Sequence, residues 1–133
     1  MSLLRVFDVA GTAMMAQSVR LNVTTSNLAN AETVSASTEQ TYRARHPVFS
    51  TLLMGEASTG VRVRAIVESD AELRKRYAPD HPLADDQGYI YLPNVNVVEE
   101  MANMISASRS YQNSVEVMNT SKQMLMATLR LGQ

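Results

Sequence analysis

The sequence predicts an α+β fold, in which long N- and C-terminal helices pack as a coiled-coil-like pair and a small β- and loop-rich insertion projects between them. Residues 1–33 hold four charges and no proline, and residues 94–133 hold six charges and no proline, which favours helix at both ends. Residues 34–93 carry 15 of the 25 charges and all four prolines, which favours strands and loops. The chain therefore divides into an N-terminal core helix (1–33), an insertion (34–93) and a C-terminal core helix (94–133).

Apolar side chains recur along the N-terminal end at alternating spacings of four and three residues, as expected for a helix that packs along another helix. The positions are Leu3, Phe7, Ala10, Met14, Gln17, Leu21, Thr24 and Leu28. We expect a helix over residues 3–30, about 42 Å long at ~1.5 Å per residue. It should end near Asn30, because residues 33–38 are poor in helix formers.

The same spacing predicts a second seam near the C-terminus. Its positions are Val97, Met101, Met104, Ser108, Tyr111, Val115, Met118, Lys122, Leu125 and Leu129. Asn96 is the expected N-cap, with Glu99 three residues later as in a capping box. Arg130 favours the C-terminal end of the helix dipole and Gly132 lies just beyond it.

The insertion reads as short strands joined by loops. Residues 61–66 alternate apolar and polar side chains, residues 71–77 read more weakly as strand, and residues 89–92 form a third candidate closed by Pro93. Residues 42–45 and 48–49 are expected to be extended. Residues 79–88 are rich in turn formers and predict a long loop.

No pattern in the sequence favours catalysis or a cofactor. Cysteine is absent, the net charge is −1, and no glycine-rich phosphate loop or glycine-flanked nucleophile occurs. Asp80, His81, Asp85 and Asp86 could gather around a cation, but an exposed turn is the stronger interpretation. We therefore expect no enzyme activity, no cofactor, no metal site, no nucleic acid and no small-molecule substrate.

The sequence also predicts no direct membrane insertion. No apolar run reaches the roughly 18 residues that a spanning helix needs. The first eight residues lack the charged and apolar regions of a secretory signal peptide.

Two stretches resemble the flagellar rod and hook axial protein family. Residues 21–33, with Ser-Asn-Leu-Ala-Asn at their centre, resemble its N-terminal signature, although Glu32 stands where many relatives have Asp or Asn. Residues 91–133 and the short chain length are similar to the proximal rod members of that family.

The resemblance implies a structural subunit of the bacterial flagellar basal body. Such a subunit would assemble helically with other proximal and distal rod proteins and with copies of itself. It would transmit motor torque to the hook and filament. The resemblance also implies a periplasmic rod, with the flagellar export apparatus as a partner and type III export without a cleaved signal peptide.

The residues expected to form the assembly interface combine apolar seam positions with two asparagines. They are Phe7, Met14, Leu21, Asn27, Leu28, Asn30, Met101, Met104, Tyr111, Val115, Met118, Leu125 and Leu129. On the residues alone, Asn27 and Asn30 fit equally a simple helix C-terminus and a junction with the insertion. The resemblance favours the junction.

One function of a different class stays open. Nine methionines give the seams flexible apolar side chains, which suit surfaces that repack against several partners. A soluble adaptor or chaperone-like protein could therefore bind partner helices through these Met-rich seams.

Overall fold

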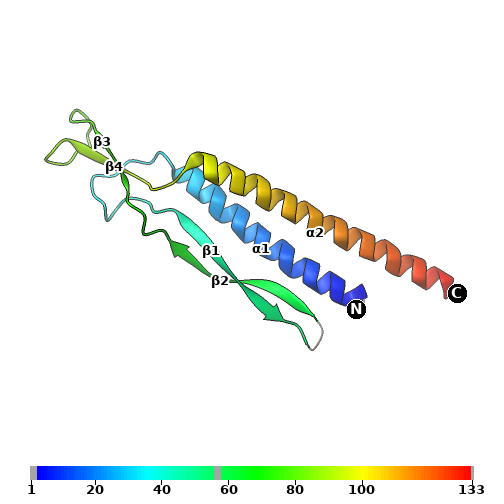
Figure 1. Ribbon diagram of the computed structural model, residues 1–133. Coiled ribbons are helices and arrows are strands. Elements are labelled where there is room, and N and C mark those ends of the chain that lie inside the picture. The colour runs from blue at the N-terminus through cyan, green and yellow to red at the C-terminus, as the bar shows by residue number, and fades with distance from the viewer. Residues whose placement is uncertain (1–2, 56–57, 133) are drawn as a thin grey trace.

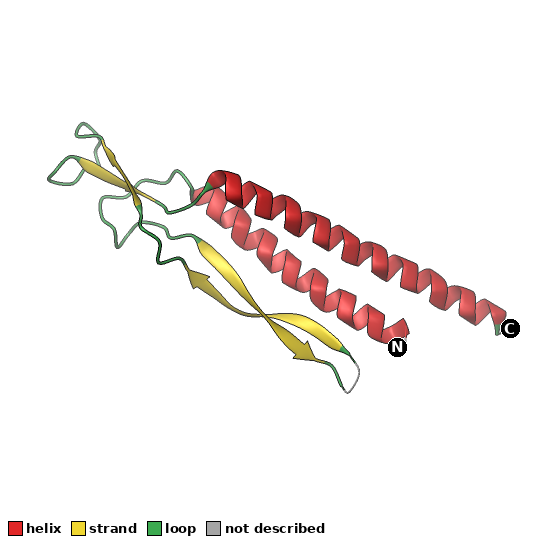
Figure 2. Cartoon of the chain, viewed as in Figure 1, coloured by secondary structure: helices red, strands yellow, loops and turns green. Residues whose placement is uncertain are grey.

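The computed structural model describes residues 3–55 and 58–132, and within them four strands connect two long helices in chain order (Figure 1). In chain order the elements are α1 (Leu3–Asn30), β1 (Arg45–Leu53), β2 (Thr59–Glu68), β3 (Arg74–Tyr77), β4 (Tyr89–Leu92) and α2 (Val97–Leu131). The predicted α+β class and the helix over residues 3–30 are confirmed. Figure 2 shows the two helices side by side and the strands as two separate hairpins.

The two helices run antiparallel, with both chain ends at the same end of the molecule (Figure 1). Arg20 of α1 donates a hydrogen bond to Asn103 Oδ1 of α2 at 3.0 Å. The predicted N-cap is confirmed, because Asn96 Oδ1 accepts from the backbone N–H groups of Val98 and Glu99. Since α2 has 35 residues and α1 has 28, α2 continues beyond the first residues of α1.

The face that α2 turns inward differs from the predicted seam near the two ends of the helix. Four of the predicted positions are exposed there: Val97, Met101, Lys122 and Leu129. The buried residues of α2 are Glu100, Ala107 and Ser121, which are seven or fourteen residues apart. The predicted positions Met101 and Leu129 are 53% and 60% exposed, so neither packs against α1 within one chain, and their place in a contact with other subunits stays a prediction. Two of these three buried residues, Ala107 and Ser121, have small side chains, which let two helices approach closely.

The strands form two antiparallel hairpins. β1 pairs with β2 from Arg45 opposite Glu68 to Leu53 opposite Thr59, with a bulge between Val48 and Phe49. β3 pairs with β4, and residue 35 adds an isolated bridge to residue 91. The strands predicted at 61–66 and 89–92 are confirmed. The weak strand at 71–77 begins only at residue 74. Of the segments expected to be extended, 48–49 lies inside β1 and 42–45 joins it only at residue 45, where β1 begins.

Only part of the insertion projects from the helix pair. The β3–β4 hairpin extends beyond the end where α1 finishes and α2 begins, whereas the β1–β2 hairpin folds back along α1 (Figure 1). The contact is close: Thr12 Oγ1 accepts a hydrogen bond from the Val61 N–H at 3.2 Å, and a Cβ on Gly60 would lie 2.6 Å from that oxygen. Glycine at position 60 therefore allows the hairpin to lie against α1.

Candidate assembly surfaces and the junction that orients them

The side chain of Asn27 joins the end of α1 to the start of β1. Its amide is fully buried, and Nδ2 donates to the Arg45 carbonyl at 2.8 Å while Oδ1 accepts from the Arg45 N–H at 2.9 Å. The Tyr42 hydroxyl donates to the same Oδ1 at 2.8 Å. One side chain thus bonds both backbone groups of a single residue, as a neighbouring strand would.

Asn94, two residues before the N-cap of α2, bonds the backbone of the preceding residue, Ala44, and of two residues that follow β2. Its Oδ1 accepts from the Ala44 N–H at 2.8 Å, and its Nδ2 donates to the carbonyls of Ser69 and Ala71 at 3.2 and 2.9 Å. Asparagines at the two helix ends therefore bond consecutive residues, 44 and 45. This arrangement fixes the direction in which the insertion leaves the helix pair.

Arg74 links β3 to both helix ends. Its Nη2 donates to the Ala31 carbonyl at 2.6 Å and its Nε donates to the Pro93 carbonyl at 2.9 Å. Ala31 also packs with Ala44 and Val95 in a small buried apolar cluster. We refer to Asn27, Asn94, Arg74 and this cluster as the junction.

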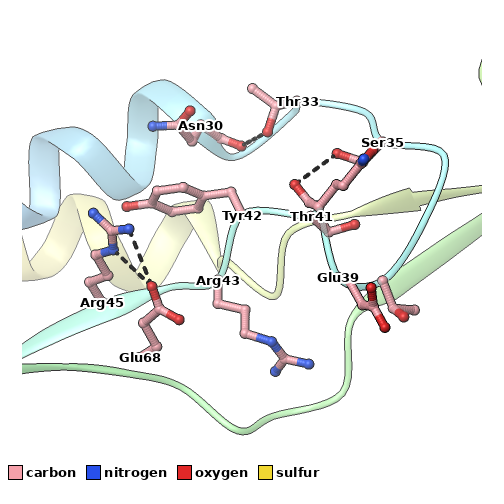
Figure 3. Close-up of a pocket in the computed structure, with 11 residues that line it drawn as sticks. Asn30, Thr33, Ser35, Glu39, Thr41, Tyr42, Arg43, Arg45 and Glu68 are labelled. Atoms are coloured by element: carbon pink, nitrogen blue, oxygen red, sulfur yellow. Dashed lines mark hydrogen bonds and ion pairs between the residues drawn. The ribbon is translucent and has the colours of Figure 1, made fainter.

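A polar hollow of about 770 Å³ lies beside the junction, around residues 33–43 (Figure 3). Its charged side chains include Arg45 and Glu68, which form an ion pair at 3.2 Å. Asn30 borders it, and there Thr33 Oγ1 donates to the Asn30 carbonyl at 2.8 Å. The Asn30 amide itself donates to the carbonyl of Ser26, four residues earlier, so it caps its own helix rather than bonding β1.

The predicted interface residues divide into three groups by exposure. Asn27 is fully buried and Met101 and Leu129 are exposed. The others are half-buried: Phe7, Met14, Leu21, Leu28, Asn30, Met104, Tyr111, Val115, Met118 and Leu125. Within one chain the half-buried set is partly covered, whereas Met101 and Leu129 remain exposed on α2.

The chain exposes more surface than a compact protein of its size. Its accessible surface is 9079 Å², against about 6,900 Å² expected for a compact monomer of 14.7 kDa. Many exposed large apolar side chains lie on α2, among them Val98, Met101, Ile105 and Leu129. Exposed apolar surface of this extent is typical of a chain that packs against others.

Sequence reasoning missed Asn94 and Arg74. Arg74 lies in the segment 71–77, which the sequence predicts only weakly as strand, yet it donates to two backbone carbonyls. Asn94 lies in residues 91–133, which carry the family resemblance, but its residue type alone predicts no partner. A usable signal was its position between a strand that ends at residue 92 and a helix that begins at residue 97, where backbone groups lack ladder partners.

In the loop between β3 and β4, the Asp85 carboxylate accepts the hydrogen bonds that hold the turn. Asp85 Oδ1 accepts from the N–H groups of Tyr89 and Gln87 at 2.8 and 3.0 Å, and Oδ2 accepts from the Tyr91 hydroxyl at 2.9 Å. His81 Nδ1 accepts from the Leu83 N–H at 3.1 Å. Two of the four candidate cation ligands, His81 and Asp85, are therefore engaged in local turn structure, and no group of three or more potential ligands occurs in the described part of the chain.

This loop predicts a measurable pH dependence. The hydrogen bond from the Tyr89 N–H, followed by those from Tyr91 and Gln87, lowers the pKa of Asp85 below 3.8, although partial burial opposes the shift. Because the folded pKa is depressed, the carboxylate stabilises the hairpin above pH 3.8, and this stabilisation is lost as the pH falls through the lowered pKa. We expect exchange protection of the Tyr89 amide to fall in acid, as measured by NMR.

The matched variants for this prediction are Asp85→Asn and Asp86→Asn. The first should remove the acid-dependent loss of protection, while the second, one residue along and exposed, should retain it. Protection in the native chain that stays constant far below pH 3 would contradict the assignment to Asp85.

None of the described helices is long and apolar enough to cross a membrane.

Two protein-family models match the two ends of the chain, and related proteins match it over its full length. Residues 7–36 match the model for the flagella basal body rod protein family, and residues 86–131 match the model for the C-terminal part of flagellar basal body rod FlgEFG proteins. The chain is 52% identical over 134 residues to the flagellar basal-body rod protein FlgC of Salmonella typhimurium. It is 53% identical to that of Escherichia coli O157:H7 and 41% identical to that of Buchnera aphidicola subsp. Acyrthosiphon pisum, with complete coverage of each chain.

Proposed function

Because the chain belongs to the FlgC family of flagellar basal-body rod proteins, we propose that it is built into the proximal part of the rod and assembles there with neighbouring rod proteins and with copies of itself. It is a structural subunit of the rod. The full-length identity of 52% carries the proposal, and the exposed apolar side chains of α2 support it.

The junction suggests separate roles for the helical core and for the insertion. We propose that residues 1–33 and 94–133 form the core that packs in the rod and that residues 34–93 contact neighbouring subunits. Hydrogen bonds from Asn27, Asn94 and Arg74 hold the insertion at a fixed angle to the helices. A rigid junction of this kind suits a part that transmits motor torque to the hook and filament.

The finer location also rests on family membership. We propose that the rod built from this chain lies in the periplasm. The chain would reach it through the flagellar type III apparatus without cleavage of a signal peptide, so that the export apparatus is a transient partner. Accumulation of the chain inside cells whose flagellar export apparatus is inactivated is the expected result.

The chain is proposed to act without catalysis, cofactor or metal. The polar side chains that could carry chemistry are engaged with backbone: Asn27, Asn94 and Arg74 at the junction, and Asp85 and His81 in the β3–β4 loop. These hydrogen bonds stabilise the fold of the chain.

The assembly role predicts a large effect of Leu125→Asp. Leu125 is half-buried near the end of α2, beyond Ser121, the last buried residue of that helix. Loss of a buried leucine side chain costs roughly 2–5 kcal/mol, and a buried carboxylate adds to it. Because the free subunit buries Leu125 only in part, we expect the variant to fold and stay soluble, yet fail to enter the rod.

Complementation of a strain that lacks the native chain measures this effect through swimming, flagella per cell and the chain content of purified basal bodies. Arg64→Asp, on the exposed face of β2, is the control and should assemble nearly normally. Normal rods with Leu125→Asp would refute the helical interface. Failure of the native chain to co-purify with basal bodies would favour the soluble adaptor instead.

A further inference from the structure

The β1–β2 hairpin is a sheet of only two strands, so each strand has one edge that the other strand does not cover. Hydrogen bonds at its two ends fix which residues point outward: the Ser69 N–H donates to the Ala44 carbonyl, and the Met54 N–H donates to the Ser58 carbonyl. In an antiparallel pair, residues bonded in this way alternate with residues whose N–H and carbonyl groups point away from the other strand. The register therefore turns outward the backbone groups of residues 45, 47, 49, 51 and 53 of β1, and of residues 59, 61, 63, 66 and 68 of β2.

Helix α1 covers one half of each edge. At the base of the hairpin it lies beside β1, where Asn27 bonds the outward N–H and carbonyl of Arg45. Near the tip it lies beside β2, where Thr12 Oγ1 accepts from the outward N–H of Val61. The hairpin is twisted, so the strand nearer to α1 changes along its length (Figure 1). The β1 edge near the tip and the β2 edge near the base are left uncovered by α1.

Near the tip, β1 lacks the features that usually keep an edge strand from pairing with another chain. Those features are charged side chains, proline, bulges and a covering helix or loop. Pro47 supplies one of them nearer the base, but residues 49–53 include no charge and no proline. Phe49 and Leu53 are 39% and 77% exposed, and no side chain of the described residues bonds the outward groups of residues 49, 51 and 53. We refer to residues 49–53 as the open edge of β1.

The open edge of β2, residues 66–68, lies at the base of the hairpin. The outward N–H and carbonyl groups there belong to Ile66 and Glu68, and they have no side-chain partner in the part of the chain that the structure describes. Ile66 and Val67 are 51% and 45% exposed, and the Glu68 carboxylate is paired with Arg45 of the same hairpin. Backbone donors and acceptors with apolar side chains beside them are what an added strand binds.

We propose that the open edge of β1 in one copy pairs with the open edge of β2 in a second copy, so that one sheet continues from hairpin to hairpin. This inference rests on the proposed function, and the partner is another molecule of this chain. In two copies that point the same way, β1 of one runs antiparallel to β2 of the other. Thr51 then lies opposite Ile66 of the second copy and Phe49 opposite its Glu68, so that outward backbone groups meet outward backbone groups.

The contact joins two different edges, which gives assembly a direction. Two paired copies still have one open edge of each kind, so a further copy can add. Thr51 faces Val61 within its own chain but Ile66 in the next copy. Since Ile66 faces Pro47 in its own chain, four β1 residues from Thr51, successive hairpins are offset by about 14 Å at ~3.4 Å per residue. A contact between identical edges would instead stop at a dimer.

Disulfide cross-linking in purified basal bodies tests the pairing. The native chain has no cysteine, so the double variant Thr51→Cys/Ile66→Cys introduces the only two thiols of the chain. Within one copy these positions are about 14 Å apart, too far for a bridge, whereas residues opposite each other on paired strands are close enough. We expect a series of products that contain two, three and more copies. The control is Thr51→Cys alone, which should give no product.

The outcomes separate this inference from the proposed function. A dimer of Thr51→Cys alone would show that identical edges meet, which overturns the proposed pairing. Entry of the double variant into basal bodies without cross-linking overturns this inference and leaves the proposed function standing. If the native chain itself is missing from basal bodies, the proposed function fails.

A proline at position 51 gives a second and independent measurement. Because the Thr51 N–H points outward, Thr51→Pro removes a donor of the proposed contact and no hydrogen bond of the hairpin, while the control Thr51→Ala keeps that N–H. We expect several-fold less of the proline variant than of the native chain in basal bodies, and a nearly normal amount of the alanine variant. Hydrogen exchange of the Ser50 and Leu52 amides, which bond β2, verifies that the hairpin is intact. Normal assembly of Thr51→Pro with an intact hairpin would contradict the proposal.

Discussion

Replacement of Ala107 with glutamate is expected to separate α2 from α1 and to unfold most of the chain. Ala107 is completely buried on the inward face of α2, midway between Glu100 and Ser114. A glutamate there brings both extra volume and an unpaired charge into the helix contact, which costs several kcal/mol. Since whole domains are stable by only about 5–15 kcal/mol, most of the folded population should be lost.

The measurement is urea unfolding followed by circular dichroism at 222 nm. Ser106→Glu adds the same charge one residue away on the exposed side of α2, and it should change the free energy of unfolding by about 0.5 kcal/mol or less. The comparison also tests which face of α2 is turned inward. Equal stability of the two variants would show that Ala107 does not face α1.

The helices and their ends were predictable because their signals are local. The spacing of apolar residues, the N-cap Asn96 and the helix-poor residues after Asn30 act within a few positions of one another. The inward face of α2 was less predictable. The regular spacing of apolar residues does not distinguish a face that packs on α1 from a face that stays exposed. Helix α2 has apolar side chains on both kinds of face.

Contacts between distant parts of the chain gave no usable signal in the sequence. Val61 and Thr12 are 49 residues apart, and the hydrogen bond between them places the β1–β2 hairpin along α1. Nothing near either residue indicates the other. Likewise Arg74 donates to two backbone carbonyls, which every residue has, and its carboxylate partner Glu32 is 42 residues away, so nothing near Arg74 in the sequence indicated its role.

For the two asparagines, neither the residue type nor the family resemblance predicted which backbone group each side chain bonds. A polar side chain near a helix end predicts a backbone hydrogen bond but not its partner. Asn30 bonds its own helix at Ser26, whereas Asn27 bonds β1 at Arg45. Of the two interpretations left open by the residues, the helix terminus describes Asn30 and the junction describes Asn27.

Replacement of Asn27 with leucine is expected to detach the insertion from the helix pair. The two side chains are similar in size, so the change removes hydrogen bonds rather than volume. It removes the partner of the Arg45 N–H and of the Arg45 carbonyl at a part-buried position, while the Tyr42 hydroxyl keeps Ser26 Oγ at 3.2 Å. An unsatisfied buried polar group costs about 1–3 kcal/mol, so we expect a loss of roughly 2–4 kcal/mol for the two backbone groups.

Hydrogen exchange followed by mass spectrometry locates the effect as well as its size. In Asn27→Leu, protection should fall in β1 and β2 while α1 and α2 keep most of theirs, because Ala107 and the rest of the helix contact are untouched. Asn30→Ala removes one half-buried bond within α1 and should cost no more than about 1 kcal/mol, which makes it the control. Rods should then form normally with Asn30→Ala and poorly with Asn27→Leu, since an insertion at a variable angle cannot present the same surface in every subunit. Normal protection of β1 in Asn27→Leu would mean that the junction is held by Asn94 and Arg74 without it.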